Sequence, residues 1–171
     1  LDAVRQAAGE SRSVLCLTVA SRFSASFDSA EAAAREAKEA LPDLEVSVLE
    51  SQSAAGGEGL IALEAWRAAT LDASLNEVRQ IAQKLIVQVR LLAFVDTLYY
   101  LWKGGRVPRI AHQGASLLRI KPLFELAQGQ VRTVARPRTH RRAVRRLIEM
   151  MRQRVGPAPI HATVMHADAV E

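Results

Sequence analysis

The sequence predicts an α/β fold. Its first part is a strand–helix–strand unit in which the two strands run parallel. Residues 13–19 and 45–49 are short runs rich in Val and Leu, as expected for strands buried on both faces of a sheet. Between them, residues 26–40 repeat small and apolar side chains at three- and four-residue steps, the spacing of a helix with one buried face. This order makes a βαβ unit. The length of 171 residues leaves one or two domains open.

The chain after the second strand is predicted to hold four further elements. They are a helix through Leu60 behind a Ser/Ala/Gly-rich loop at 50–59, a helix over 75–90, a strand over 91–95 and a short helix over 97–102. Ser74 and Glu77 have the spacing of a capping box at the start of the second of these helices. Asp96 is expected to cap the short helix.

Beyond residue 120 the pattern predicts a β-hairpin, a basic amphipathic helix and a last strand. The hairpin pairs 121–126 with 131–135, the helix covers 139–154 and the last strand covers 160–166. The helix has a predicted apolar stripe made of Val144, Leu147, Ile148, Met151 and Val155.

Charge is divided unevenly along the chain. Residues 1–100 carry 9 Lys and Arg against 14 Asp and Glu, a net charge of −5, whereas residues 101–171 carry 14 against 4, a net charge of +10. The two halves therefore differ in the partners that they attract.

Composition excludes several classes of protein. The single cysteine, Cys16, cannot form an intrachain disulfide or a cysteine-based metal site, which favours a reducing, cytoplasmic compartment. No apolar run approaches the roughly 20 residues that span a bilayer, and no signal-peptide pattern opens the chain. The four histidines show no metal-ligand spacing and no catalytic triad pattern.

Residues 1–9 have the pattern of the second half of a helix that ends at a glycine, so we expect the sequence to be a fragment.

Two loops that follow predicted strands are candidate binding sites. In residues 21–26, the hydroxyls of Ser21, Ser24 and Ser26 meet the start of a helix, where backbone N–H groups and the helix dipole favour a carboxylate or a phosphate. Serine in this position is also the ordinary N-cap residue. The loop at 50–59 follows the neighbouring strand, and ligands of open α/β sheets sit beyond the carboxyl ends of strands. The loop over 21–26 carries no nucleotide-binding motif.

The basic helix over 139–154 has several possible roles. Its basic residues, together with Arg138 directly before it, are Arg138, Arg141, Arg142, Arg145, Arg146, Arg152 and Arg154. A solvated face, an acidic protein partner, nucleic acid and anionic lipid all remain open. The helix has no aromatic residue, which argues against stacking on single-stranded bases.

Three segments, taken in order, resemble the DegV family of bacterial fatty-acid-binding proteins. The first is the serine loop over 21–30, and the second is the loop over 50–60. The third and most specific runs from Phe94 through Asp96, Gly104-Gly105-Arg106, Gly114, Leu117-Leu118 and Ile120-Lys121-Pro122 to Gly129. The resemblance covers the chain from about residue 13 to the end.

The resemblance implies a two-domain DegV-like fold, with a βαβ first domain over 1–95 and a smaller α/β second domain with a hairpin over 96–171. It implies one long-chain fatty acid held between the domains, with no cofactor, no metal and no catalytic residue in the chain. Ser24, Ser26 and Ser21 are the implied carboxylate-binding residues. The residues expected to line the acyl-chain tunnel are Phe23, Phe27, Leu60, Phe94 and Leu118. Further family segments that contribute to the carboxylate site are expected to lie before Leu1 and after Glu171.

The family resemblance also implies a partner. Members present the fatty-acid carboxylate to a separate ATP-dependent kinase, so the chain is expected to be a carrier and not an enzyme. Arg106 and Arg138 match positions that the resemblance associates with docking the kinase, and an arginine fork suits carboxylate and phosphate groups. The alternative function is a nucleic-acid-binding protein with a basic surface. A catalytic α/β enzyme is disfavoured because no nucleophile with a neighbouring base is found.

Overall fold

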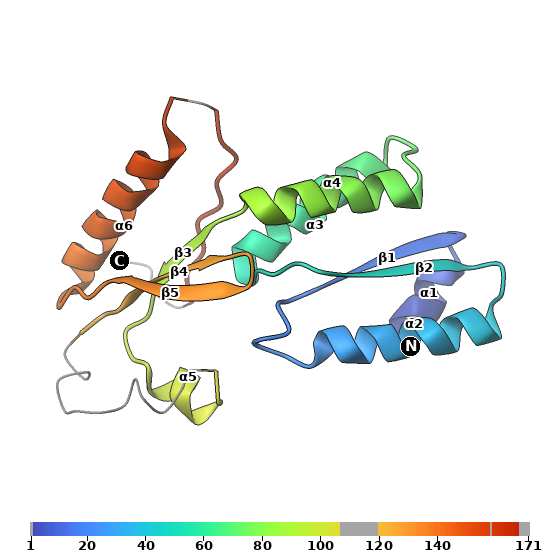
Figure 1. The fold of residues 1–171 in the computed structure, drawn as a ribbon, viewed down its shortest axis with the longest axis horizontal. Coiled ribbons are helices and arrows are strands. Elements are labelled where there is room, and N and C mark those ends of the chain that lie inside the picture. Colours follow the sequence, from blue (N-terminus) through green and yellow to red (C-terminus); the bar gives the residue numbers. More distant parts are fainter. Residues whose placement is uncertain (1, 107–119, 158, 168–171) are drawn as a thin grey trace. The chain divides into compact units, whose positions relative to one another are not determined.

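The computed structural model describes residues 2–106, 120–157 and 159–167 and shows two compact units (Figure 1). The first unit comprises Leu1–Val89 with Ala127–Gly129, and the second comprises Arg90–Leu126 with Gln130–Glu171. The domain boundary that the sequence places between residues 95 and 96 stays a prediction.

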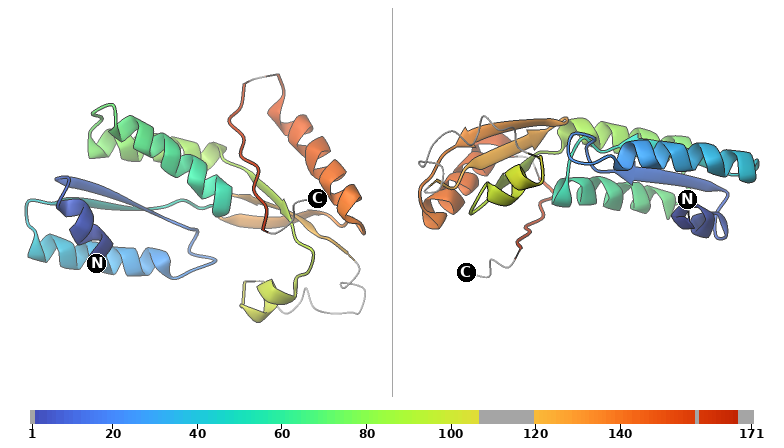
Figure 2. Two further views of the ribbon diagram at one scale, coloured as in Figure 1. Left: turned by 180° about the vertical axis from the view of Figure 1, so that it is seen from behind. Right: turned by 90° about the horizontal axis from the view of Figure 1, so that it is seen from below.

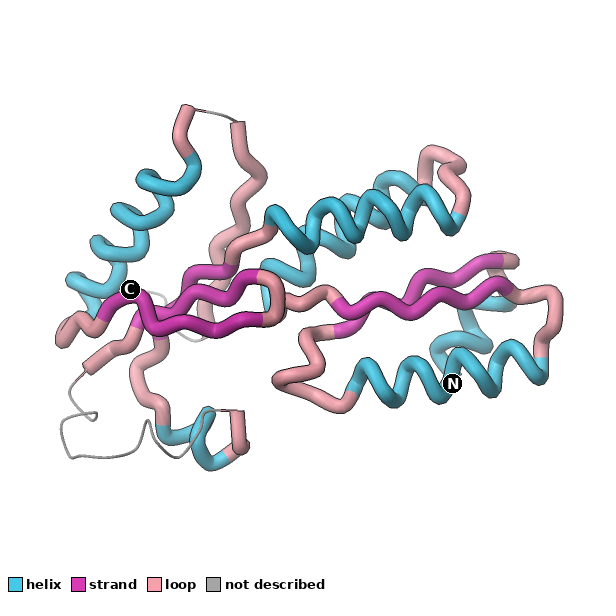
Figure 3. Tube along the Cα trace, viewed as in Figure 1, coloured by secondary structure: helices cyan, strands magenta, loops and turns pink. Residues whose placement is uncertain are grey.

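The first unit contains the predicted βαβ arrangement. Its elements are α1 (Asp2–Ala8), β1 (Ser13–Thr18), α2 (Ser26–Ala40), β2 (Glu45–Glu50), α3 (Ala55–Ala69) and α4 (Leu75–Gln88). Strands β1 and β2 pair in parallel, in a register that runs from Ser13 opposite Glu45 to Thr18 opposite Glu50. Figure 3 shows this pair between the helices of the unit.

The β1–β2 sheet is covered on both faces. Leu15, Leu17 and Leu49 pack against the core between α3 and α4, whereas Val14 and Val46 pack against residues of α1 and α2. Successive side chains of a strand point to opposite faces, so a sheet with two covered faces needs apolar residues at both sets of positions. This explains the nearly continuous apolar runs of the sequence.

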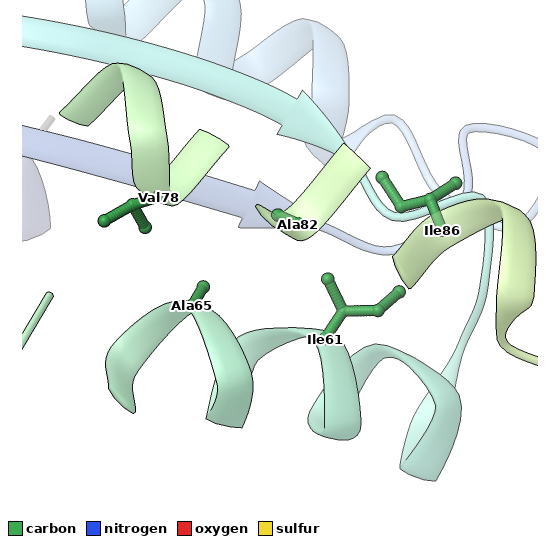
Figure 4. Close-up of a cluster of buried hydrophobic side chains, with 5 residues drawn as sticks. All are labelled: Ile61, Ala65, Val78, Ala82 and Ile86. Atoms are coloured by element: carbon green, nitrogen blue, oxygen red, sulfur yellow. The ribbon is translucent and has the colours of Figure 1, made fainter. Parts of the chain in front are cut away.

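Helices α3 and α4 lie side by side, as the view from behind shows (Figure 2). Ile61 and Ala65 of α3 point toward Val78, Ala82 and Ile86 of α4, and all five are buried (Figure 4). The predicted capping box at the start of α4 is confirmed, because Ser74 Oγ accepts a hydrogen bond from the Glu77 amide and the Glu77 carboxylate accepts one from the Ser74 amide at 2.8 Å.

The sequence predicts a loop over 50–59, but helix α3 already begins at Ala55. Gly56 and Gly57 belong to its first turn and are buried. A Cβ on Gly57 would lie 2.2 Å from Ser53 Oγ and 3.2 Å from Val89 Cγ1. The glycine is therefore a packing residue that lets the helix approach its neighbours, and not a loop signal.

The second unit is built on an antiparallel sheet. Its elements are β3 (Leu91–Phe94), α5 (Tyr99–Lys103), β4 (Leu123–Ala127), β5 (Gln130–Ala135) and α6 (His140–Val155), with strand order β3-β4-β5. The predicted hairpin is confirmed, and its two-residue turn, Gln128 and Gly129, has φ values of 48° and 69°. Positive φ at both positions is typical of the type I′ turn that suits the twist of a hairpin.

The buried face of helix α6 overlaps the predicted stripe only in part. Ala143 and Met150 are buried and Leu147 and Val155 of the stripe are half-buried, whereas its other members Val144, Ile148 and Met151 are exposed. Near the start of the helix His140 stacks edge-on against Phe94, with ring centroids 5.1 Å apart. Near its end Arg154 forms an ion pair with the buried Glu125 of β4. These contacts at the two ends fix a rotation of the helix that the periodicity alone does not determine.

Two local predictions are wrong. Asp96 does not cap α5; the Thr97 hydroxyl accepts a hydrogen bond from the Tyr99 amide at 3.1 Å, and the Asp96 carboxylate pairs with Lys121 instead. Residues 160–166 form no strand, and Val164 is 95% exposed. A strand is stable only when it pairs with another, and no strand pairs with this segment in the part of the chain that the structure describes.

Candidate functional site

Two loops meet at the carboxyl edge of the β1–β2 sheet. The first follows β1 and ends where α2 begins at Ser26, and the second follows β2 and ends where α3 begins. Backbone hydrogen bonds join them, since the Ala20 amide donates to the Ser53 carbonyl at 2.9 Å and the Ser51 amide donates to the Thr18 carbonyl at 2.8 Å. The structure thus brings together the two loops that the sequence singles out.

The start of α2 presents the hydroxyls of Ser24 and Ser26. Ser24 Oγ accepts a hydrogen bond from the Ser26 amide at 3.1 Å, an arrangement that leaves its own hydroxyl hydrogen available for a ligand. Ser26 Oγ is buried and has no hydrogen-bond partner among the described residues. Ala25 between them has φ −80°, an ordinary value for a residue with a side chain, so the alanine fits this loop without strain.

Ser21 differs from the other two serines. Its amide and its hydroxyl both donate to the same Glu50 carboxylate oxygen, at 2.7 Å and 2.9 Å. The hydroxyl hydrogen is already used, and a negative charge lies beside it. Ser21 therefore connects the two loops, and its hydroxyl is less available to an anionic ligand than those of Ser24 and Ser26.

Further buried hydroxyls lie in or next to these loops, and the sequence patterns did not mark them as site residues. Thr18 Oγ1 and Ser53 Oγ are buried with no hydrogen-bond partner in the described part of the chain. The Ser51 hydroxyl donates to the Ser53 carbonyl at 3.4 Å and accepts from the Ser53 amide at 3.2 Å. A buried hydroxyl costs free energy unless it forms a hydrogen bond, so these groups favour a polar ligand or water at this edge.

Two titratable groups of the first unit are shifted by burial. Burial raises the pKa of the Glu58 carboxyl in the first turn of α3. Burial also raises the pKa of the Cys16 thiol in β1, which makes this thiol a weak nucleophile. No group of three or more His, Cys, Asp and Glu side chains that could hold a metal lies within residues 2–106, 120–157 and 159–167.

The residues expected to contact an acyl chain fall in different places. Phe23, Phe27 and Leu60 are half-buried in the first unit, and Phe94 lies in β3 of the second unit. Leu118 lies outside the described residues. That these side chains line one tunnel stays a prediction.

The two candidate docking arginines lie in the second unit, and both are exposed. Arg106 follows the glycine pair after α5, and its guanidinium donates to the Gly104 carbonyl at 2.6 Å. Arg138 precedes α6 by two residues. Their role stays a prediction.

None of the described helices combines the length and the apolar character that crossing a membrane requires.

Comparison with known proteins extends the resemblance to the whole chain. The family model described as "Uncharacterised protein, DegV family" matches residues 1–171. A DegV domain-containing protein of Streptomyces coelicolor is 31% identical over 156 residues, which cover 91% of this chain and 54% of that protein. Another DegV domain-containing protein, from Clostridium acetobutylicum, is 32% identical over 136 residues, which cover 80% of this chain and 48% of that protein. The chain spans about half the length of the curated relatives it matches.

Solved structures agree with this assignment. A DegV family protein of Thermus thermophilus with fatty acid binding is 29% identical and matches with a TM-score of 0.75 over 89% of this chain and 52% of that one. A stearic acid-binding protein of Eubacterium ventriosum is 22% identical and has the same fold. It matches with a TM-score of 0.79 over 90% of this chain and 53% of that one. The family match along the full sequence, supported by these relatives, shows that the chain belongs to the DegV family.

Proposed function

We propose that this protein binds a long-chain fatty acid and that the hydroxyls of Ser24 and Ser26 hold its carboxylate. The observation that carries the proposal is the Ser26 hydroxyl, which is buried at the start of α2 without a partner among the described residues. Membership of the DegV family and the fatty acid binding of the Thermus thermophilus relative point to the same ligand.

The chemistry of the α2 start suits a carboxylate. Two hydroxyl groups, each with a hydrogen to donate, lie two residues apart, and the Ser24 oxygen is oriented by the bond from the Ser26 amide. Hydrogen bonds to an ionised acceptor are about twice as strong as those between neutral groups. The 15-residue α2 adds the positive end of its dipole. Ser21 is a weaker candidate because it donates to Glu50.

We further propose that the protein is a carrier and not itself an enzyme. The Streptococcus pneumoniae Fatty Acid Kinase B3 protein, loaded with linoleic acid, has the same fold, with 22% identity and a TM-score of 0.76 over 88% of this chain and 53% of that one. By analogy, this protein would present the carboxylate to a separate kinase that transfers a phosphoryl group from ATP to it. Arg106 and Arg138, both exposed in the second unit, are the residues proposed to dock that kinase.

Native mass spectrometry of the full-length protein purified from cells tests the ligand. We expect a co-purifying mass that equals a long-chain fatty acid, and its loss in the Ser24→Ala, Ser26→Ala double variant. Ser47→Ala is the matched control, because Ser47 Oγ is also buried without a described partner but lies within β2. RNA adducts in place of a fatty acid would instead establish the nucleic-acid alternative.

A further inference from the structure

An open groove of about 820 Å³ runs along α6 in the second unit. Seven α6 residues line it, at alternating steps of one and three residues that keep them on one face of the helix: His140, Arg141, Val144, Arg145, Ile148, Glu149 and Arg152. A single stripe of the helix therefore forms this wall of the groove. Asp96 and Lys121 line it from outside the helix. We call this feature the α6 groove.

The α6 groove has an apolar strip. Val144 is 37% exposed and Ile148 is 39% exposed, and Met151, next along the helix surface, is 37% exposed. The adjacent face of α6 is buried through Ala143 and Met150. Contiguous aliphatic side chains at one surface of a helix that is already packed indicate a contact surface.

The described side chains that line the α6 groove carry a net positive charge. Arg141, Arg145 and Arg152 form no ion pair with a carboxylate of the described residues. The two carboxylates that line the groove already have cationic partners, since Asp96 pairs with Lys121 and Glu149 pairs with Arg146. An occupant that carries negative charge would therefore meet three arginines that form no ion pair within the described part of the chain.

We propose that the α6 groove docks an acidic amphipathic helix of a protein partner. Apolar side chains of that helix would cover Val144 and Ile148, and its carboxylates would pair with the arginines on either side. From Arg141 to Arg152 the stripe is about 16 Å long, which matches about three turns of a partner helix. This inference deepens the proposed carrier function, from which the need for a protein partner comes, and it is separate from the proposed roles of Arg106 and Arg138.

The lining of the groove favours a protein helix over nucleic acid or lipid. No Phe, Tyr or Trp side chain is among the described lining residues to stack on bases. A concave surface does not lie flat on a bilayer, whereas a groove is the usual receptor for the apolar face of a helix.

Fluorescence anisotropy with the full-length protein tests the proposal. The probe is a labelled 18-residue synthetic peptide with Leu on one helical face and Glu on the other, and a second peptide of the same composition with the order scrambled is the control. Arg145→Glu and Ile148→Ser change the groove. Arg132→Glu, at an exposed position of β5, makes the same change of charge elsewhere in the unit. Circular dichroism checks that each variant is folded.

We expect the amphipathic peptide to bind, the scrambled peptide to bind at least about tenfold more weakly, and Arg145→Glu and Ile148→Ser each to weaken binding about tenfold. Arg132→Glu should change affinity less than twofold. Equal losses in Arg145→Glu and Arg132→Glu, no binding to the full-length protein, or groove-dependent binding of RNA or anionic vesicles in place of the peptide would overturn the proposal. Native mass spectrometry of the same samples distinguishes failure of this proposal from failure of the proposed function. Absence of a bound fatty acid would contradict the carrier function, whereas it would leave the measured binding of the peptide unaffected.

Discussion

Glu50 at the end of β2 accepts two hydrogen bonds from Ser21 in the loop that follows β1, one from the amide at 2.7 Å and one from the hydroxyl at 2.9 Å. Both bonds join residues that are 29 positions apart in the sequence. Together they hold the serine loop against the neighbouring strand, so Glu50 positions the loop that carries Ser24 and Ser26.

Replacing Glu50 should therefore weaken ligand binding without removing a ligand contact. We expect Glu50→Ala to lower the free energy of unfolding by about 1 kcal/mol, the usual net value of such hydrogen bonds, and to reduce fatty-acid affinity. Glu45→Ala, at the exposed start of the same strand, is the control. Chemical denaturation and titration with a fluorescent fatty acid measure the two effects. Unchanged affinity in Glu50→Ala would contradict the positioning role.

Ser26→Ala separates binding from stability. Because Ser26 Oγ has no described partner, its removal should leave the unfolding midpoint of the ligand-free protein unchanged or slightly raised. The same change should lower fatty-acid affinity by about tenfold or more, since a hydrogen bond to a charged group contributes about 1.5–3 kcal/mol. Ser47→Ala should leave the affinity unchanged. A loss of affinity in both variants would show that the assay reports stability and not carboxylate binding.

Gly57→Ala and Gly59→Ala should have opposite effects, although both lie in α3. A Cβ at residue 57 meets Ser53 Oγ at 2.2 Å, whereas nothing lies within 4 Å of one at residue 59. We expect Gly57→Ala to destabilise the protein by about 1–3 kcal/mol and Gly59→Ala to stabilise it by up to about 1 kcal/mol. Thermal unfolding measures both. Adding Ser53→Ala to Gly57→Ala should recover part of the loss, because it removes the closest atom; no recovery would mean that the clash with Val89 dominates.

The ion pair between Arg154 and Glu125 should stabilise the packing of α6 on its sheet. Glu125 is only 9% exposed, so Arg154→Ala leaves a buried carboxylate without its cation and should cost about 1–3 kcal/mol. Arg152→Ala, on the groove side of the same helix, should change stability by less than about 0.5 kcal/mol. Denaturant midpoints give the comparison. In the Arg154→Ala background, Glu125→Gln should restore stability, and further destabilisation there would contradict this account.

The capping box of α4 should make a contribution that depends on pH. Hydrogen bonds from the Ser74 side chain and backbone lower the pKa of the Glu77 carboxyl. A carboxyl with a lowered pKa stabilises the folded state at pH values above its unfolded pKa, and this contribution is lost as the pH falls through the folded pKa. The wild type should therefore exceed Glu77→Ala in thermal midpoint at neutral pH, with a difference that shrinks below about pH 4. Glu10→Ala removes a carboxylate that lies outside the described helices and is the control. A constant difference between wild type and Glu77→Ala down to acidic pH would contradict the linkage.

Local sequence patterns determined most of the elements and the place of the candidate site. The apolar runs of β1 and β2, the periodicity of α2, the Ser74–Glu77 pair and the hairpin over Leu123–Ala135 were all predictable, because each depends on residues close together in the chain. The serine loop was predictable for the same reason, and the parallel order of the strands implied that it would meet the second loop. The charge difference between the two halves was likewise readable from the sequence alone.

Tertiary structure decided which of these groups are available and which are already paired. Ser21 donates to Glu50, Asp96 pairs with Lys121 and does not cap α5, and the Arg154–Glu125 pair helps to fix which side of α6 faces the sheet. Each of these contacts joins residues at least 25 positions apart, whose approach depends on how whole elements pack. The physical reason is that a hydroxyl, a carboxylate or a helical stripe has several partners of comparable energy, and packing selects one. Sequence therefore located the candidate carboxylate site, whereas the fold distinguished Ser24 and Ser26 from Ser21 and exposed the α6 groove.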